Sequence, residues 1–278
     1  MGPQKTDIWS GSLHQTFRLL PRDQQSRNLM PFLEADGLTS DELLSRLPYD
    51  RVRSTQPDRP GPDPKRYRDG KQVYQTAGLL YEDGGRIHVT ALGEATRRWL
   101  AIITPKNRVL LVRHAAYALA SCQLRNPTGA GEKYGDGVKV FPFAFIWRAM
   151  LALDRRISSD ELNRGIFKVT NEDELARTVE TIRSARAKND IGLLGEETLT
   201  GRAKNDRIIP WMSLASFGWT LFPDKRGGEA GDYYELDSHA LSVVKEAAKV
   251  RHQHRSFSSV AEYIEHVARC AALPKDLR

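Results

Sequence analysis

Six polar side chains between residues 64 and 78 have the chemistry needed to contact nucleic acid. Arg and Lys can donate hydrogen bonds to guanine O6 and N7, and Gln can pair with adenine N6 and N7. An α-helix fits the major groove, and we expect residues 64–78 to form one, with Tyr67 and Tyr74 turned partly inward. The alternative is a solvated helix face that binds nothing. The six side chains are Lys65, Arg66, Arg68, Lys71, Gln72 and Gln75.

Basic residues are concentrated just before and within this helix. Between residues 51 and 71, seven Lys and Arg stand against three Asp, a surplus of four in a chain whose net charge is +7. We expect Arg51 and Arg53 to hold phosphates, which sets the affinity for a nucleic acid but carries no sequence information. The sequence pI of about 9.4 also favours a polyanionic partner.

The segment that follows predicts a β-hairpin and another helix. Two short β-prone runs, residues 79–81 and 86–89, stand on either side of Glu82-Asp-Gly-Gly85, which is a strong hairpin signal. Thr90 then starts a further helix. The order helix, hairpin, helix is typical of a winged helix-turn-helix, in which Arg86 on the hairpin is expected to hold a phosphate.

The same pattern occurs a second time further along the chain. Residues 219–222 and 233–236 repeat the two strands, and Asp237 starts the closing helix. Upstream of each hairpin lies a helix start with a capping box, in which two side chains satisfy each other's exposed backbone donors. Two weak matches in the same order support a repeated unit. The two boxes are Thr39 with Glu42 and Ser158 with Glu161.

The second copy has its own candidate for a DNA-reading helix, at residues 206–217. This helix is more apolar than residues 64–78, so packing into a core is an equally good interpretation. The loop between the two strands of this copy is longer and basic. The DNA contacts expected here are Arg202, Lys204, Asn205, Arg207, Lys225 and Arg226.

Two long helices are expected to fix the spacing of the units. Residues 105–124 carry an apolar stripe that includes Val109, and residues 141–153 are almost wholly apolar. The predicted fold class is mainly α with small β-hairpins (α+β), as tandem winged helix-turn-helix units joined by these helices. The predicted domains are residues 1–125 and 139–278, on either side of a mobile glycine-rich linker at 126–138.

No catalytic residue is predicted. A metal-dependent nuclease needs carboxylates and a Lys on adjacent strands. Asp58, Asp63 and Lys65 have the right residue types, but they stand among prolines, where no core strand can form. The glycine-rich loop lacks the Gly-Lys-Ser/Thr ending of a phosphate-binding loop. We therefore expect no cofactor and no enzymatic site in this chain, although it can be part of a larger nuclease.

Histidine and cysteine usage also argues against a metal site. His252 and His254 are two residues apart with no second cluster of ligands, so a basic face toward solvent or phosphate is a better interpretation than zinc binding. Cys122 and Cys270 form no Cys-rich framework. With no signal-peptide pattern and no long apolar run, the sequence predicts a soluble protein of the reducing cytoplasm.

Aromatic residues can form a cage for an extruded or modified base. Trp147, Trp211 and Trp219 fall on apolar periodic positions, where core packing is favoured. The aromatic residues left as candidates for a surface position are Trp9, Tyr67, Tyr74 and Tyr134.

The chain resembles the DNA-recognition portion of restriction endonucleases of the FokI and AlwI type, which consists of successive winged helices. Short motifs spread over most of the chain carry the resemblance: Asp7-Ile-Trp9, Thr16-Phe-Arg18, Ala77-Gly78-Leu79, Ile87-His-Val-Thr90-Ala-Leu-Gly93, Arg113-His114, Phe141-Pro142-Phe143 and Ser159-Asp160-Glu161-Leu162. The carboxylate and lysine core of the family's nuclease is missing, so a recognition module, a partner subunit or a fragment of a longer enzyme is implied.

The sequence therefore favours specific binding of double-stranded DNA by tandem winged helices within a restriction or phage-defence system, with a modified base as one permitted target. Such a module would work with a nuclease domain or subunit. A winged-helix transcriptional regulator, with the C-terminal helices used for dimerisation, is a second hypothesis. The third is a protein-interaction scaffold that does not bind DNA. Much of this functional weight comes from analogy of fold.

Overall fold

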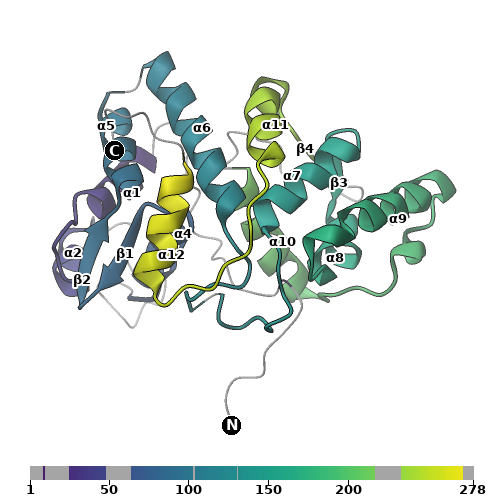
Figure 1. Ribbon diagram of the computed structural model, residues 1–278, viewed down its shortest axis with the longest axis horizontal. Coiled ribbons are helices and arrows are strands. Elements are labelled where there is room, and N and C mark those ends of the chain that lie inside the picture. The colour runs from purple at the N-terminus through teal and green to yellow at the C-terminus, as the bar shows by residue number, and fades with distance from the viewer. Residues whose placement is uncertain are drawn as a thin grey trace, which may run out of the picture. The chain divides into compact units, whose positions relative to one another are not determined.

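A computed structural model describes residue 9 and residues 25–47, 64–102, 104–129, 131–216 and 233–271. The chain is mainly helical, with two small antiparallel sheets (Figure 1). This confirms the α+β class. No helix among the described residues is long and apolar enough to cross a membrane.

The described residues form two compact units, which we name after one helix in each. The α4 unit contains the described residues of 25–119 together with 258–271, and the α10 unit contains Trp9 and the described residues of 120–257. This division differs from the predicted domains, because Trp9 belongs with the later part of the chain and the last helix with the earlier part. The segment 126–138 lies inside the α10 unit, where Thr128 and Tyr134 are buried.

The α4 unit consists of helices around one hairpin. Helix α12 packs against β1 and α5, and α1 packs against α5 and α2. The elements are α1 (Gln25–Leu33), α2 (Ser40–Arg46), α4 (Pro64–Thr76), β1 (Leu80–Asp83), β2 (Arg86–Val89), α5 (Ala91–Ala101), α6 (Pro105–Ser121, whose last residues belong to the α10 unit) and α12 (Val260–Cys270).

Two expectations for α6 need correction. The helix ends at Ser121 and not at residue 124, and Val109, which was expected in its apolar stripe, is 61% exposed. The later part of the predicted stripe, Val112, Ala116, Leu119 and Ala120, is buried as expected, together with Leu111 and Ala115. His114 on this face stacks on Trp99, and its Nδ1 contacts the carbonyl oxygen of Ala271. Burial lowers the pKa of His114, so its ring is neutral at physiological pH and Nδ1 donates the hydrogen bond.

The α10 unit also consists of helices and one small antiparallel sheet, β3–β4, and it has additional helical segments between α8 and α10. Helix α7 packs against α11, α9 and α10. The elements are α7 (Pro142–Ala152), β3 (Arg156–Ser158), α8 (Ser159–Arg164), η1 (Ile166–Lys168), η2 (Glu172–Glu174), α9 (Leu175–Lys188), η3 (Ile191–Leu194), α10 (Arg202–Ala215), β4 (Tyr233–Glu235), η4 (Ser238–Ala240) and α11 (Leu241–Lys249).

A largely buried ion pair links three segments of the α10 unit, which are α7 with its N-cap, η2 and the end of α11. The Arg148 guanidinium on α7 contacts the Glu172 carboxylate and donates to the carbonyl oxygens of Ala248 (2.8 Å) and Val250 (3.0 Å). The second oxygen of Glu172 accepts from the backbone N–H of Phe141 (2.8 Å). Burial raises the pKa of Glu172 and lowers that of Arg148, so desolvation outweighs the attraction between the two charges. The backbone hydrogen bonds offset part of that penalty.

Gly78, directly after α4, is required for two independent reasons. Its φ is 75°, a left-handed conformation that L side chains rarely adopt, and a Cβ at this position would lie 2.8 Å from Val267 Cγ1 of α12. Gly37 has nearly the same φ, 76°, but no atom lies within 4 Å of its Cβ position. Comparison of substitutions at the two glycines therefore distinguishes the effect of backbone strain from the effect of packing against α12.

We expect substitution of these two glycines by Ala to lower the free energy of unfolding by different amounts. Gly37→Ala should lower the free energy of unfolding by about 1 kcal/mol through the left-handed backbone alone. Gly78→Ala should lower it by about 1–3 kcal/mol more, because α12 must also move away. Urea unfolding of both variants measures the difference, and equal losses would show that α12 does not pack on Gly78.

Candidate nucleic-acid interface

Helix α4 has one buried face and one polar face. Tyr67, Val73 and Tyr74 are buried, and both tyrosine rings pack on Phe32 of α1, with ring centroids 5.8 and 4.9 Å apart. Burial raises the pKa of both hydroxyls. The helix spans Pro64–Thr76, which confirms the predicted element to within two residues.

The polar face of α4 carries three of the predicted contact residues. Arg68 is exposed, and Gln72 and Gln75 are partly exposed. They follow one another at spacings of four and three residues, which places them on one side of an α-helix. The backbones of Lys65 and Arg66 lie in the first turn of α4, while their side chains are outside the described residues. The described part of this face therefore presents one guanidinium and two amides.

The side chain of Lys71 contacts other residues of the α4 unit and does not extend into solvent as a phosphate-binding residue would. Its ammonium pairs with the Glu82 carboxylate on β1, lies 3.4 Å from Ser40 Oγ, and sits 5.3 Å from the centroid of the Tyr67 ring. Its side chain is only 15% exposed. The sequence shows Lys71 as one more basic residue in a basic run, and nothing local indicates that β1 supplies its counter-ion.

The hairpin is fixed to the helices by backbone hydrogen bonds. Leu80 pairs with Val89 and Asp83 with Arg86 in the β1–β2 register, and Gly84 and Gly85 have the positive φ values that a tight hairpin turn requires. The N–H of Ile87 donates to the carbonyl oxygen of Leu38 (2.8 Å). The backbone just before α2 thus pairs with β2.

Arg86 lies where this backbone pairing meets the start of α2. It forms an isolated antiparallel bridge with Thr39, and its Nη1 donates to the carbonyl oxygen of Gly37 (2.6 Å). Thr39 is the N-cap of α2, and both halves of its capping box with Glu42 are present. The hydrogen bonds from Thr39, aided by Arg86 and Arg46, lower the pKa of Glu42. Arg86 remains exposed and oriented at the edge of the hairpin.

The α10 unit has the corresponding pairing. Strand β3 runs directly into α8, whose capping box of Ser158 and Glu161 is also complete, and Ser158 pairs with Tyr233 of β4. Tyr233 thus occupies the position that Arg86 has in the other unit. Its ring is 40% exposed, with the guanidinium carbons of Arg156 and Arg186 at 4.9 and 5.5 Å from its centroid. The predicted strand at 219–222 lies outside the described residues.

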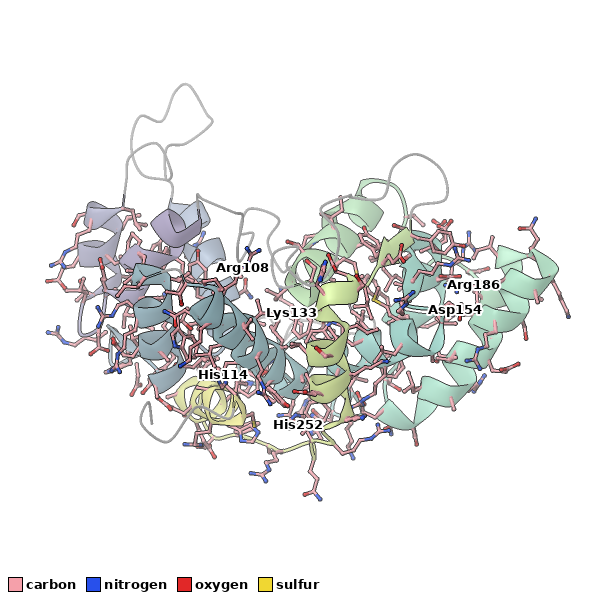
Figure 2. All side chains as sticks on the ribbon, turned by 90° about the horizontal axis from the view of Figure 1, so that it is seen from above. Arg108, His114, Lys133, Asp154, Arg186 and His252 are labelled. Atoms are coloured by element: carbon pink, nitrogen blue, oxygen red, sulfur yellow. The ribbon has the colours of Figure 1, made fainter. Side chains whose placement is uncertain are left out.

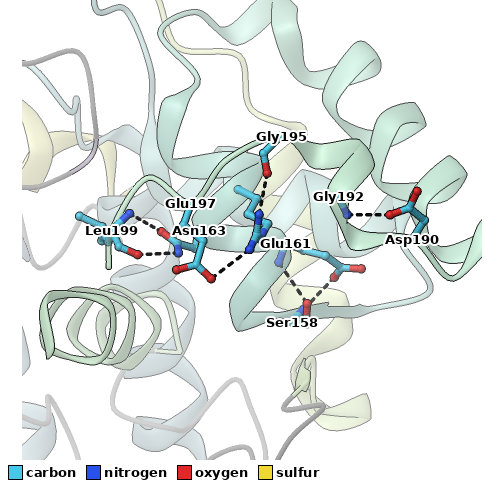
Figure 3. Close-up of polar contacts among 9 residues, drawn as sticks. Ser158, Glu161, Asn163, Asp190, Gly192, Gly195, Glu197 and Leu199 are labelled. Carbon is cyan, nitrogen blue, oxygen red and sulfur yellow. Dashed lines mark hydrogen bonds and ion pairs between the residues drawn. The ribbon is translucent and has the colours of Figure 1, made fainter. Parts of the chain in front are cut away.

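Helix α10 begins at Arg202 instead of the predicted Asp206, because a folded segment leads into it. The Asn163 side chain on α8 donates to the carbonyl oxygen of Leu199 (2.9 Å) and accepts from its N–H (2.8 Å), as Figure 3 shows. Arg164 adds a hydrogen bond to Gly195 and an ion pair with Glu197. The buried Asn163 therefore sets the chain's entry into α10.

The other end of α10 is attached to the core. Trp147 Nε1 on α7 donates to the carbonyl oxygen of Ala215 (2.9 Å). Trp211 on α10 lies 5.8 Å from Trp9 between ring centroids, and both are buried. Packing therefore accounts for the apolar half of α10.

Several predicted contacts fall outside what the structure describes. Four residues lie on backbone segments that are not described, and four more are in the first two turns of α10 with side chains that are not described. The first four are Arg51, Arg53, Lys225 and Arg226, and the second four are Arg202, Lys204, Asn205 and Arg207. Their roles stay predictions.

The four aromatic residues that were candidates for a surface position do not lie at one. Trp9, Tyr67, Tyr74 and Tyr134 are all buried. Trp9 is fully covered, stacks on Phe167 at 5.7 Å, and donates from Nε1 to the carbonyl oxygen of Val169 (2.7 Å). Its partners are some 160 residues away in the sequence, so no local pattern could reveal them. These four rings are not available to hold an extruded base.

No group of three or more His, Cys, Asp or Glu side chains within the described residues is placed to bind a metal ion. His252 and His254 lie on the extended segment after α11, and each is near the ring of Phe141.

The Asn163 contacts predict a measurable change in stability. Asn163→Ala removes both hydrogen bonds to Leu199 and should lower the free energy of unfolding by about 1–3 kcal/mol, since the two backbone groups lose their partner. Glu197→Gln in the same segment removes one charge of the partly exposed ion pair with Arg164 and should change the free energy of unfolding by less than about 1 kcal/mol. Urea unfolding tests both, and an Asn163→Ala value no larger than that of the control would contradict the assignment.

Comparisons with known proteins identify a likeness of fold. No protein-family model and no curated protein matches the sequence. Among solved structures, the chain is similar to the BpuJ1 endonuclease binding domain, which was crystallised in complex with pyrene- and phenanthrene-modified DNA. The TM-score is 0.54 at 11% sequence identity, and the match covers 88% of this chain and 90% of that chain. The α+β fold of this protein is thus similar to that of an endonuclease binding domain crystallised with DNA; the FokI and AlwI type stays a prediction.

Proposed function

We propose that this protein binds specific sequences of double-stranded DNA through two winged-helix units, as the recognition module of a restriction or phage-defence system. A nuclease domain or subunit would then be its functional partner. The single observation that carries the proposal is the polar face of α4, a helix that packs against β1 of the hairpin and is joined to it by the Lys71–Glu82 ion pair.

The α4 face suits the major groove in both shape and chemistry. A single helix fits that groove, and the helix termini and hairpin can reach the flanking phosphates. Arg68 has the fork of donors that recognises guanine, and Gln72 and Gln75 each have the donor and acceptor that recognise adenine. Arg86, exposed at the start of β2, is suitably placed to hold a phosphate beside the helix. Base reading is therefore assigned to α4.

The repeated architecture supports a second contact in the α10 unit. Its pairing of β3 with β4 matches the pairing before α2, and the basic residues at the start of α10 correspond to those of α4. Because the described part of α10 is mostly buried, we assign this unit chiefly to phosphate contacts. The likeness to an endonuclease domain crystallised with DNA supports DNA as the partner.

The proposal also includes recognition of a modified base by the same module. The burial of Trp9, Tyr67, Tyr74 and Tyr134 makes an aromatic cage from these residues unsuitable, so a methyl group would be recognised by contact in the major groove. Selection of bound duplexes from a random pool, followed by binding to unmodified and methylated copies with and without Mg²⁺, tests sequence and modification together. Binding without cleavage fits a recognition module, and a palindromic site bound by a dimer would favour the transcriptional regulator.

If the polar face of α4 reads bases, substitution of Arg68 on that face should lower the affinity for the selected duplex specifically. Arg68→Ala should weaken binding to the selected duplex by about 1–3 kcal/mol, or roughly 5- to 150-fold, because a bidentate base contact is lost. Binding to a scrambled duplex should change much less. Arg98→Ala removes the same charge from the exposed side of α5 and should affect both duplexes weakly and equally. Fluorescence anisotropy measures all four combinations, and absence of duplex binding at low salt would favour a protein scaffold.

A further inference from the structure

An extended segment without helix or strand structure follows α11 at residues 250–257 (Figure 1), and it carries the exposed basic side chains of Arg251 and Arg255. Its conformation is fixed by hydrogen bonds to side chains of two helices or their ends. Gln123 accepts from the N–H of Arg255 (2.7 Å) and donates to its carbonyl oxygen (3.1 Å). Arg148 donates to the carbonyl oxygen of Val250. The segment is therefore held in place before any ligand arrives.

The side chains of this segment alternate between the surface and the interior. Arg251, Gln253 and Arg255 are exposed, whereas His252 and His254 are partly buried, with ring centroids 5.6 and 6.4 Å from that of Phe141. In an extended chain, alternate side chains lie on one side at intervals of about 7 Å. Figure 2 shows His252 at an edge of the unit, apart from Asp154 and Arg186.

Two further cations lie close to these residues. Burial, followed by the charges of Arg125 and Lys139, lowers the pKa of His254. His254 is therefore neutral at physiological pH, and the positive charge of this surface comes from Arg and Lys. Lys139, Arg251 and Arg255 take part in none of the ion pairs among the described residues, while Arg125 pairs with the largely exposed Asp136 at 2.6 Å.

We propose that Arg125, Lys139, Arg251 and Arg255, which we call the basic strip, bind phosphates of the DNA backbone without reading bases. This inference rests on the proposed DNA-binding function and adds a contact outside both DNA-reading helices. Two of these cations, Arg251 and Arg255, lie on one side of a preformed extended segment, which is suited to the repeated phosphates of a DNA strand. Protein partners usually require an apolar or aromatic anchor, and the exposed large apolar side chains of the described residues lie elsewhere.

The salt dependence of DNA binding tests the basic strip. The double variant Arg251→Gln with Arg255→Gln should reduce the slope of log affinity against log salt by about 1 to 2, because each lost phosphate contact removes about 0.9. The ratio of affinities for the selected and scrambled duplexes should stay unchanged. The matched control is Arg177→Gln with Lys188→Gln, which removes two exposed charges from α9 of the same unit and should leave the slope close to wild type.

The outcomes separate this proposal from the proposed function. If the unsubstituted chain binds DNA and all three proteins show the same slope of log affinity against log salt, the basic strip alone would be overturned. A strip variant that loses discrimination between duplexes would also overturn it, since the strip would then contribute to base reading. A wild-type chain that binds no duplex would overturn the DNA-binding function and the strip together. Equal urea midpoints for the two variants would show that both are folded.

Discussion

In each unit, the backbone just before a capped helix pairs with a strand that comes much later in the chain. Residues 37–39 pair with β2, and β3 pairs with β4. This pairing determines where the hairpin residues lie relative to the helices, because a strand displaced by one residue would turn its side chains to the opposite face. Arg86 and Tyr233 occupy equivalent positions through it. The placement of α2 beside the hairpin depends on this short stretch of hydrogen bonds, and the Lys71–Glu82 ion pair joins α4 to the same hairpin.

Different kinds of interaction stabilise the cores of the two units. In the α4 unit, aromatic and aliphatic side chains do so: Phe32 contacts both tyrosines of α4, and α12 closes over Gly78. In the α10 unit, the buried Arg148–Glu172 pair joins α7, η2 and the end of α11, while Trp9 enters the core from a distant part of the chain. The polar side chains proposed to bind DNA can therefore face solvent without weakening the core.

Local features of the fold were predictable from the sequence, and distant contacts were not. The capping boxes at Thr39 and Ser158 and the tight turn at Gly84-Gly85 each depend on residues within a few positions of one another, and each was found where expected. The burial of Trp9 depends on residues near 167, and the pairing of Lys71 depends on a carboxylate on another element. Helical periodicity indicated the inner face of α4 correctly but placed Val109 in a core that does not cover it.

The candidate site was predictable to the same extent. Composition and order selected α4, because basic residues and glutamines precede a hairpin. They did not distinguish the outward Arg68 from Lys71, since both belong to one basic run and only the fold brings Glu82 to the second. The basic strip is a similar case: the Arg-His-Gln-His-Arg motif is visible in the sequence, but Gln123 and Phe141, which keep it extended, are more than a hundred residues away.

Methylation interference on a selected duplex tests the central claim, base reading by α4 in the major groove, most directly. Dimethyl sulfate modifies guanine at N7 in the major groove and adenine at N3 in the minor groove, so one experiment examines both grooves. The proposed geometry predicts that N7-methylated guanines at fixed positions are excluded from the bound fraction. Interference confined to N3-methylated adenines, or none at any position, would contradict base reading by α4.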